Sequence, residues 1–152
     1  MHYKKLLDGL TILDFSHRLP GPLAGRVLSE LGAKVYKIED QTFKDAFLSG
    51  VFSEMDSDFD NWYHHLNDKK SLIRVDFKSE EGLKKITELV HQADAIIMGL
   101  PPKVKEALNL SKEKLADKNI AVIEMGASEK IKTPMHDLNA LALSNFLSLY
   151  VA

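Results

Sequence analysis

The chain has 152 residues, of which 45% are hydrophobic and 28% charged, and it contains no cysteine. This length and composition are those of one globular domain with a substantial core, and they exclude disordered and fibrous classes. Without cysteine, disulfides, thiolate metal ligands and thiol nucleophiles are excluded as well.

The net charge of −2 gives the chain no general attraction for nucleic acid or for acidic membrane surfaces. No apolar run approaches the roughly 20 residues that a membrane-spanning helix needs, and the first residues lack the apolar segment of a signal peptide. We therefore expect no nucleic-acid partner, no membrane association and a cytoplasmic location.

Short apolar runs alternate with segments of helical periodicity along the chain. The runs predict strands at 10–15, 35–38, 72–77, 95–98 and 120–125. Strands that alternate with helices form parallel sheets with right-handed crossovers. The predicted fold is α/β: an open Rossmann-like, mainly parallel sheet with helices on both faces, in a single domain over 1–152.

The first strand runs directly into a turn and then a helix. Pro22 suits the first helical turn, and Gly32 suits the position after the helix end. The free N–H groups and positive dipole end of such a helix favour an anion. Because His17 and Arg18 stand at its mouth, the turn is a candidate anion site; a plain polar connecting loop is the alternative.

The segment 40–65 has acidic and scattered aromatic residues but no sustained period. Connections longer than about 12–15 residues tend to be functional or mobile, so we expect an irregular insertion or flap. A surface excursion that contains one short helix is the alternative. His64 and His65 could line a ligand with Trp62, but adjacent histidines lack the helical spacing of metal ligands, and we predict no metal.

The second half of the chain carries several helix signals. Ser79 is a predicted N-cap. The prolines at 101–102 break the chain before a short helix at 103–108, and Ser111 is a candidate cap for another helix that ends near residue 117. The last helix is expected to begin at 136–137 and to continue to residue 150.

Three charged positions could carry chemistry. Asp137 stands at the expected start of the last helix, where it can cap backbone N–H groups, attack a thioester as a carboxylate nucleophile, or act as a base. Lys69 and Lys70 precede the third strand and could pair with a phosphate as point charges, or both could simply be solvated. No glycine-rich dinucleotide motif and no P-loop occurs, so those nucleotide sites lack their usual signal.

Five segments carry short motifs that occur in the same order in one enzyme family. They lie at 7–22, 31–39, 66–82, 93–102 and 136–144, and the last reads His-Asp-Leu-Asn-Ala-Leu-Ala-Leu-Ser. Over nearly its whole length, the chain thus resembles the class III CoA-transferase and α-methylacyl-CoA racemase family.

The resemblance implies an open Rossmann-like domain that binds coenzyme A and acyl-CoA as substrates. By position, His17, Arg18 and Leu19 match the turn that lies near the pantetheine and thioester, and Lys69 matches a position near the nucleotide end. Asp137 matches the family aspartate, which is acylated in transferases and serves as an acid or base in racemases.

Several positions depart from the family pattern. Gly99, Leu100 and Ala107 stand where members often have an asparagine, an aromatic residue and an arginine near coenzyme A. No histidine lies between His91 and His136, where the racemases place a second base. This argues against two-base racemisation.

Family chains are more than twice as long, carry a second small domain and form interlocked dimers.

From the resemblance we predict a CoA-thioester-binding protein that transfers CoA between carboxylic acids through an aspartyl anhydride at Asp137. The alternatives are a non-catalytic binding or regulatory module, the N-terminal chain of a split enzyme and, more weakly, a 2-methylacyl-CoA racemase. We expect a homo-oligomer or a complementary chain, with the apolar end 146–150 as a candidate contact.

Overall fold

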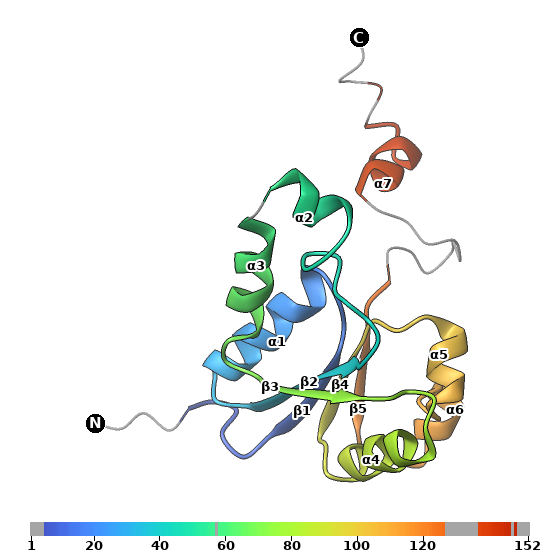
Figure 1. Ribbon diagram of the computed structural model, residues 1–152. Coiled ribbons are helices and arrows are strands. Elements are labelled where there is room, and N and C mark those ends of the chain that lie inside the picture. Colours follow the sequence, from blue (N-terminus) through green and yellow to red (C-terminus); the bar gives the residue numbers. More distant parts are fainter. Residues whose placement is uncertain (1–4, 57, 127–136, 147, 149–152) are drawn as a thin grey trace.

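The computed structural model describes residues 5–56, 58–126, 137–146 and 148 (Figure 1). In chain order the elements are β1 (Thr11–Phe15), α1 (Pro20–Glu30), β2 (Lys34–Asp40), α2 (Val51–Met55), α3 (Asp58–Asn67), β3 (Ser71–Val75), α4 (Glu80–His91), β4 (Ala95–Met98), α5 (Pro102–Ala107), α6 (Lys112–Leu115), β5 (Ala121–Glu124) and α7 (Asp137–Leu143). The described strands form a sheet in the order β3-β2-β1-β4-β5, and every pair is parallel. The predicted α/β fold is confirmed.

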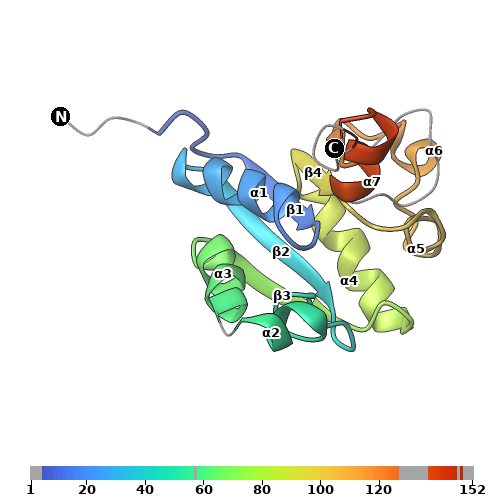
Figure 2. The same cartoon turned by 90° about the horizontal axis from the view of Figure 1, so that it is seen from above.

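Helices cover both faces of the sheet. Successive strand residues point to opposite sides, so each strand contributes side chains to a core on either face. On one face, α1 and α3 lie side by side (Figure 2). On the other face, α4, α5 and α6 enclose the larger core, which includes Leu13, Phe15, Ile38, Ile86, Ile96, Met98, Leu108 and Leu115. A smaller core beneath α1 contains Ile12, Ala33, Val35 and Ile97. Helices on both faces account for strands that are apolar on both sides.

The order of the strands creates a switch point between β1 and β4. From β1 the chain moves outward through β2 to β3, and then crosses back to place β4 on the other side of β1. In open parallel sheets, ligands bind in the crevice outside the carboxyl ends of the strands at such a point. The fold therefore directs attention to the residues that follow β1.

The segment 40–65 contains α2 and most of α3, while 41–50 forms turns and bends without helix or strand. Its Phe47 and Tyr63 form a small cluster with Leu66, and Leu48, Phe52 and Phe59 pack against it. A short helix followed by a differently oriented one gives no sustained period in the sequence. A flap function for this segment stays a prediction.

Local signals mark both ends of α1 and the start of α4. Pro22 lies in the first turn of α1, and Gly32 follows its end with a φ of +109°. The Ser79 hydroxyl accepts a hydrogen bond from the N–H of Gly82 at 2.9 Å, so the predicted cap of α4 is confirmed. Ser111 precedes α6, but its side chain accepts no hydrogen bond from the helix backbone.

The last helix is shorter than the sequence predicts. α7 ends at Leu143, and a turn follows in which Asn145 has a φ of +60°. Asparagine tolerates this left-handed conformation, which a continuing helix cannot contain. The prediction of a helix to residue 150 is therefore wrong over 144–146, while 147 and 149–150 lie outside the described residues.

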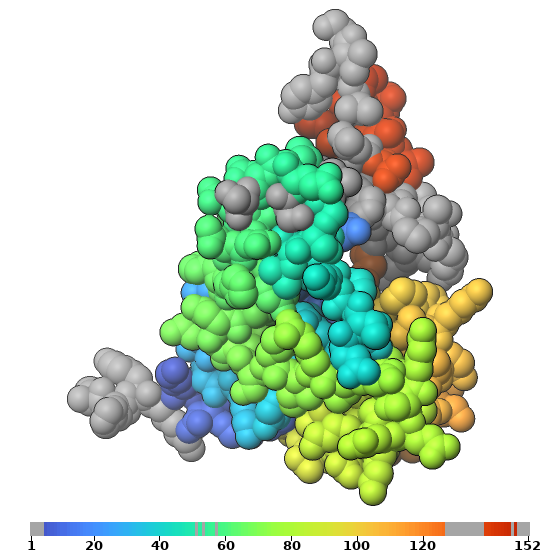
Figure 3. Space-filling model, in the orientation of Figure 1, coloured from blue at the N-terminus to red at the C-terminus, as the bar shows by residue number. Residues whose placement is uncertain are grey.

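The elements nearest the end of the described chain are poorly covered. All residues of β5 are exposed, and the atoms of α7, red in Figure 3, project from the body of the molecule. None of the described helices combines the length and the apolar character needed to cross a membrane.

Candidate functional site

The turn between β1 and α1 lies at the switch point of the sheet. It starts at Ser16, which is buried and tightly packed by its neighbours. A Cβ added to Gly21 would overlap the Ser16 side chain, and one added to Gly99 would lie 2.9 Å from Ser16 Cα. Only glycine fits at both positions, so the end of β1, the start of α1 and the end of β4 meet at this residue.

His17 holds the central position in the turn. Its imidazole packs on the ring of Phe43, with 4.4 Å between ring centroids. Burial, reinforced by the charge of Lys37, lowers the pKa of His17 to about 4, so the ring is neutral at physiological pH. Among the described residues, its Nδ1 is the one buried side-chain nitrogen or oxygen that lacks a hydrogen-bond partner. Buried polar atoms normally have partners, so this nitrogen has an unused capacity for one hydrogen bond.

The neighbouring residues Arg18 and Leu19 complete the turn. Arg18 has a φ of +63°, and its N–H donates to the Asp45 carboxylate at 2.9 Å. Leu19 occupies the N-cap position of α1 and is exposed. The loop after β2 thus covers the turn, with Phe43 against the imidazole and Asp45 against the backbone.

The helix N-terminus contributes less to an anion site than the sequence suggests. The first three residues of α1 are Pro20, Gly21 and Pro22, and proline has no N–H. Gly21 is buried, and the N–H of Leu23 already donates to the carbonyl of Leu19. Recognition at this turn therefore depends on side chains more than on the helix terminus.

A buried ion pair lies beneath the turn. The Lys70 ammonium donates to Asp14 at 2.7 Å, to the Pro22 carbonyl at 2.8 Å and to Asn67 Oδ1 at 2.9 Å. Burial alone would raise the pKa of Asp14, but the charges of Lys37 and Lys70, together with hydrogen bonds from Lys70 and Ser16, keep it below its ordinary value. Burial lowers the pKa of Lys70, and Asp14 opposes that effect.

A second buried lysine extends this polar layer along β2. The Lys37 ammonium donates to the Ser16 carbonyl and lies 3.9 Å from the Glu39 carboxylate. Glu39 accepts from the Tyr63 hydroxyl at 2.8 Å and from Arg74 Nε at 3.4 Å. Burial and the bond to Glu39 raise the pKa of Tyr63. The carboxyl half of this sheet face is therefore charged, whereas its amino half is apolar.

The structure separates the remaining predicted site residues. Lys69 is exposed and lies in the turn before β3, next to Lys70. The alternative in which both lysines are solvated is wrong for Lys70, whose side chain is fully buried. Asp137 is the first residue of α7, which Figure 1 shows beyond the carboxyl end of β5. The Asp137 side chain lies outside the described part of the structure.

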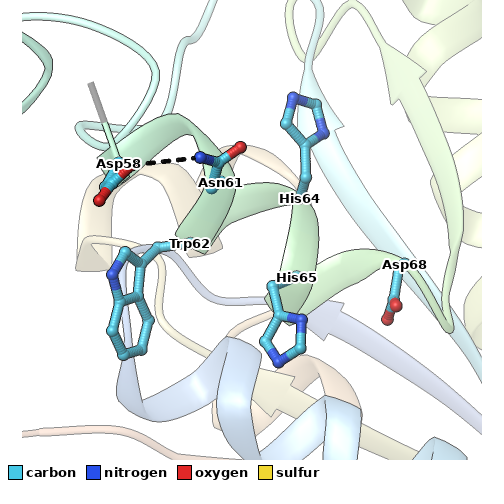
Figure 4. Close-up of a pocket in the computed structure, with 6 residues that line it drawn as sticks. All are labelled: Asp58, Asn61, Trp62, His64, His65 and Asp68. Carbon is cyan, nitrogen blue, oxygen red and sulfur yellow. Dashed lines mark hydrogen bonds between the residues drawn. The ribbon is translucent and has the colours of Figure 1, made fainter.

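A broad surface hollow of about 710 Å³ lies elsewhere, on the outer side of α3 (Figure 4). Its lining is polar around one tryptophan and consists of Asp58, Asn61, Trp62, His64, His65 and Asp68. Figure 4 shows the two histidines pointing in opposite directions. In the described part of the chain, no group of acidic or histidine side chains is arranged to hold a metal ion.

Sequence reasoning missed the residues that support the turn. Asp14 and Lys37 each interrupt an apolar strand, and a charge within a buried strand is a signal that could have revealed them. Lys70 carried no signal to distinguish it from Lys69. Phe43 and Asp45 sit in a segment without periodicity, and nothing local indicates their contacts with the turn.

The family profile and the sequence relatives that match this chain are CoA-transferases. The sequence profile of CoA-transferase family III matches residues 7–144. An acyl-CoA transferase of Fusarium pseudograminearum is 31% identical over 80% of this chain, and a formyl-CoA:oxalate CoA-transferase of Rhodopseudomonas palustris is 30% identical over 78%. In both cases the chain spans 28% of the relative's length. A crystal structure of a hypothetical protein from Mycobacterium tuberculosis matches with a TM-score of 0.76 at 27% identity, over 93% of this chain and 40% of that one.

Proposed function

We propose that this chain, which belongs to CoA-transferase family III, binds coenzyme A thioesters at the carboxyl edge of its sheet. The observation that carries the proposal is the unpartnered Nδ1 of His17 at the switch point, within the matched segment. A polar atom buried at such a point gains a hydrogen bond when a thioester or amide group of a ligand enters.

The proposed ligand contacts divide along the molecule of coenzyme A. His17, Arg18 and Leu19 form a wall for the pantetheine and the thioester, with a neutral ring and an exposed apolar side chain suited to an uncharged arm. Lys69, which is exposed, supplies a point charge for the phosphates at the nucleotide end.

The proposed reaction is transfer of CoA from one carboxylic acid to another, with Asp137 as the nucleophile. Its carboxylate attacks the thioester carbonyl and the C–S bond breaks. CoA leaves as the thiolate, and the acyl group remains on Asp137 as a mixed anhydride. The thiolate then attacks the aspartyl carbonyl and releases the first acid, which leaves an aspartyl-CoA thioester. An acceptor carboxylate attacks this thioester, and the returning thiolate takes the new acyl group and restores Asp137.

A trapping experiment tests the proposed nucleophile. Incubation with a panel of acyl-CoA thioesters, followed by hydroxylamine, should convert Asp137 to its hydroxamate, which peptide mass spectrometry locates. Asp137→Asn serves as the control and should remain unlabelled. An unmodified Asp137 with every thioester would contradict the proposed mechanism.

A second candidate is a binding or regulatory module without catalysis, or the N-terminal chain of a split enzyme. The observation that favours it is in the sequence, where Gly99, Leu100 and Ala107 stand at positions that often carry an asparagine, an aromatic residue and an arginine near coenzyme A in the family. Calorimetric titration with CoA separates the cases: binding without transfer supports the module, and transfer only after a complementary chain is added supports the split enzyme. Racemisation is the weaker alternative and would incorporate deuterium at the acyl α-carbon.

The proposed partners follow from the surface and from the family. We propose a homo-oligomer or a complementary chain, because α1 and its two cap residues expose a row of large apolar side chains: Leu19, Leu23, Val27 and Leu31. Phe146 is also exposed. Cytoplasmic location stays a prediction.

A further inference from the structure

The α1 face of the sheet carries charge where a parallel sheet is normally apolar. Asp14, Lys37 and Glu39 are all buried there, and Lys70 reaches them from the turn before β3. Removing charges from water has a large desolvation cost, which is offset only when every hydrogen-bonding group finds a partner. Because buried charges contribute little net stability, we looked to this cluster for a second role.

Lys70 joins three elements through a single ammonium group. An ammonium has three hydrogens, and here one bonds β1 at Asp14, one bonds α1 at the Pro22 carbonyl, and one bonds the end of α3 at Asn67. All the donors are used, so the group holds a defined position.

Asp14 passes this restraint on to the turn. Its second carboxylate oxygen accepts from the N–H of Ser16 at 3.0 Å and also from the Ser16 hydroxyl. Ser16 directly precedes His17, and Pro22 lies just after the turn. Lys70 consequently restrains both ends of the segment that carries His17, although it lies 56 residues from Asp14 in the sequence.

We infer that Lys70 is a positioning residue, which holds the His17 turn in the geometry that receives the ligand. It does not touch the ligand, because its side chain is fully enclosed. Coenzyme A as the ligand rests on the proposed function, whereas the restraint on His17 does not. Lys37 supports the same turn from β2 through the Ser16 carbonyl.

Gly25 offers a way to displace the ion pair without changing any charge. A Cβ at this position of α1 would lie 2.8 Å from Asp14 Oδ2 and 3.0 Å from Lys70 Nζ. Gly25→Ala therefore pushes α1 and the pair apart, while Lys37, Asp45, Asp14 and Arg18, the charges around His17, all remain.

The test combines CoA affinity by calorimetry with an NMR pH titration of the His17 imidazole in the ligand-free protein. Lys70→Met and Gly25→Ala should each weaken CoA binding at least about tenfold, since a small displacement of a binding group is costly. In both variants the His17 midpoint should rise from about 4 toward its ordinary value of 6.5, because the loosened turn admits water. Lys70→Arg keeps the positive charge but replaces the compact ammonium with a larger planar guanidinium, so in this enclosed site it should weaken binding as Lys70→Met does.

Two controls separate positioning from general destabilisation. Ile86→Val loosens the core on the opposite face of the sheet, and Lys84→Met removes an exposed lysine from α4. Neither should change CoA affinity or the His17 midpoint. The inference is overturned if Lys70→Met moves the His17 midpoint but Gly25→Ala leaves it unchanged, because charge alone would then explain the shift. It is also overturned if Ile86→Val weakens CoA binding as much as Lys70→Met does.

Failure of the proposed function gives a different pattern. If the wild type binds no CoA, the ligand proposal falls, and the His17 midpoint in the ligand-free variants alone decides the positioning role. Should Lys70→Met fail to fold, Gly25→Ala carries the decision.

Discussion

At the scale of single residues, His17 shows how burial changes the chemistry of a side chain. The ring is enclosed beside Phe43 and below the loop that carries Asp45, and its pKa falls to about 4. In the unfolded chain the imidazole regains its ordinary pKa of about 6.5. Between these two values the unfolded chain binds more protons than the folded one, so folding becomes less favourable as the pH falls.

We therefore predict that the free energy of unfolding decreases between about pH 7 and about pH 4.5 and that His17→Gln removes most of this decrease. The expected difference is roughly 2–3 kcal/mol, from the separation of the two pKa values. Asp14 and Asp40 have pKa values below their ordinary range, so their contributions are lost only at lower pH. Denaturant unfolding of both proteins at the two pH values measures the effect, and equal losses would contradict it.

Much of the candidate site lies beyond sequence reasoning for a physical reason. The turn itself could be predicted, because an apolar strand followed by a proline-rich helix start is a local pattern. Its supports could not, since Lys70 reaches Asp14 across 56 residues and Asp45 reaches Arg18 across 27. Contacts between distant segments depend on the packing of α1 and α3, which no local pattern contains.

At the scale of elements, the strength of a local signal decided which parts of the fold could be predicted. All five strands lie within or beside the apolar runs, and α4 has both an apolar face and a serine cap. α2 has only five residues, and its packing partners come from α3 and the loop before it. Such an element depends on tertiary contacts more than on its own sequence.

For α4 we predict that Ser79→Ala lowers the free energy of unfolding by about 1 kcal/mol, because the N–H of Gly82 loses its acceptor. Ser111→Ala at the start of α6 is the matched control, since the Ser111 side chain accepts no bond from its helix. Denaturant titration of the two variants compares them directly. Equal losses would mean that the hydroxyl bond contributes little.

At the scale of the whole molecule, the coverage of the sheet is uneven. Both the α1 row and the β5 strand expose apolar side chains, among them Val27 and Ile123, each 47% exposed. A row of apolar side chains on one helix is typical of a contact site, whereas scattered exposed residues are ordinary.

We predict that the protein self-associates at micromolar concentration and that Val27→Lys shifts it toward the monomer, because a charge cannot be buried at the contact without a partner. Sedimentation velocity over a range of concentrations measures the shift. Thr87→Lys, which adds the same charge to the exposed side of α4, should leave association unchanged. A wild type that sediments as a monomer throughout would contradict the prediction.

The pairing of β1 with β4 has a consequence for how the chain folds as it leaves the ribosome. β1 pairs with β2 after a short crossover, but its other neighbour begins at Ala95, more than half of the chain later. Until α4 and β4 have been synthesised, the central strand presents an open hydrogen-bonding edge. Non-local parallel pairing is slow and exposes such edges to aggregation. The vulnerable period of biogenesis should therefore last until about residue 98 has emerged, when Met98 completes the register with Phe15.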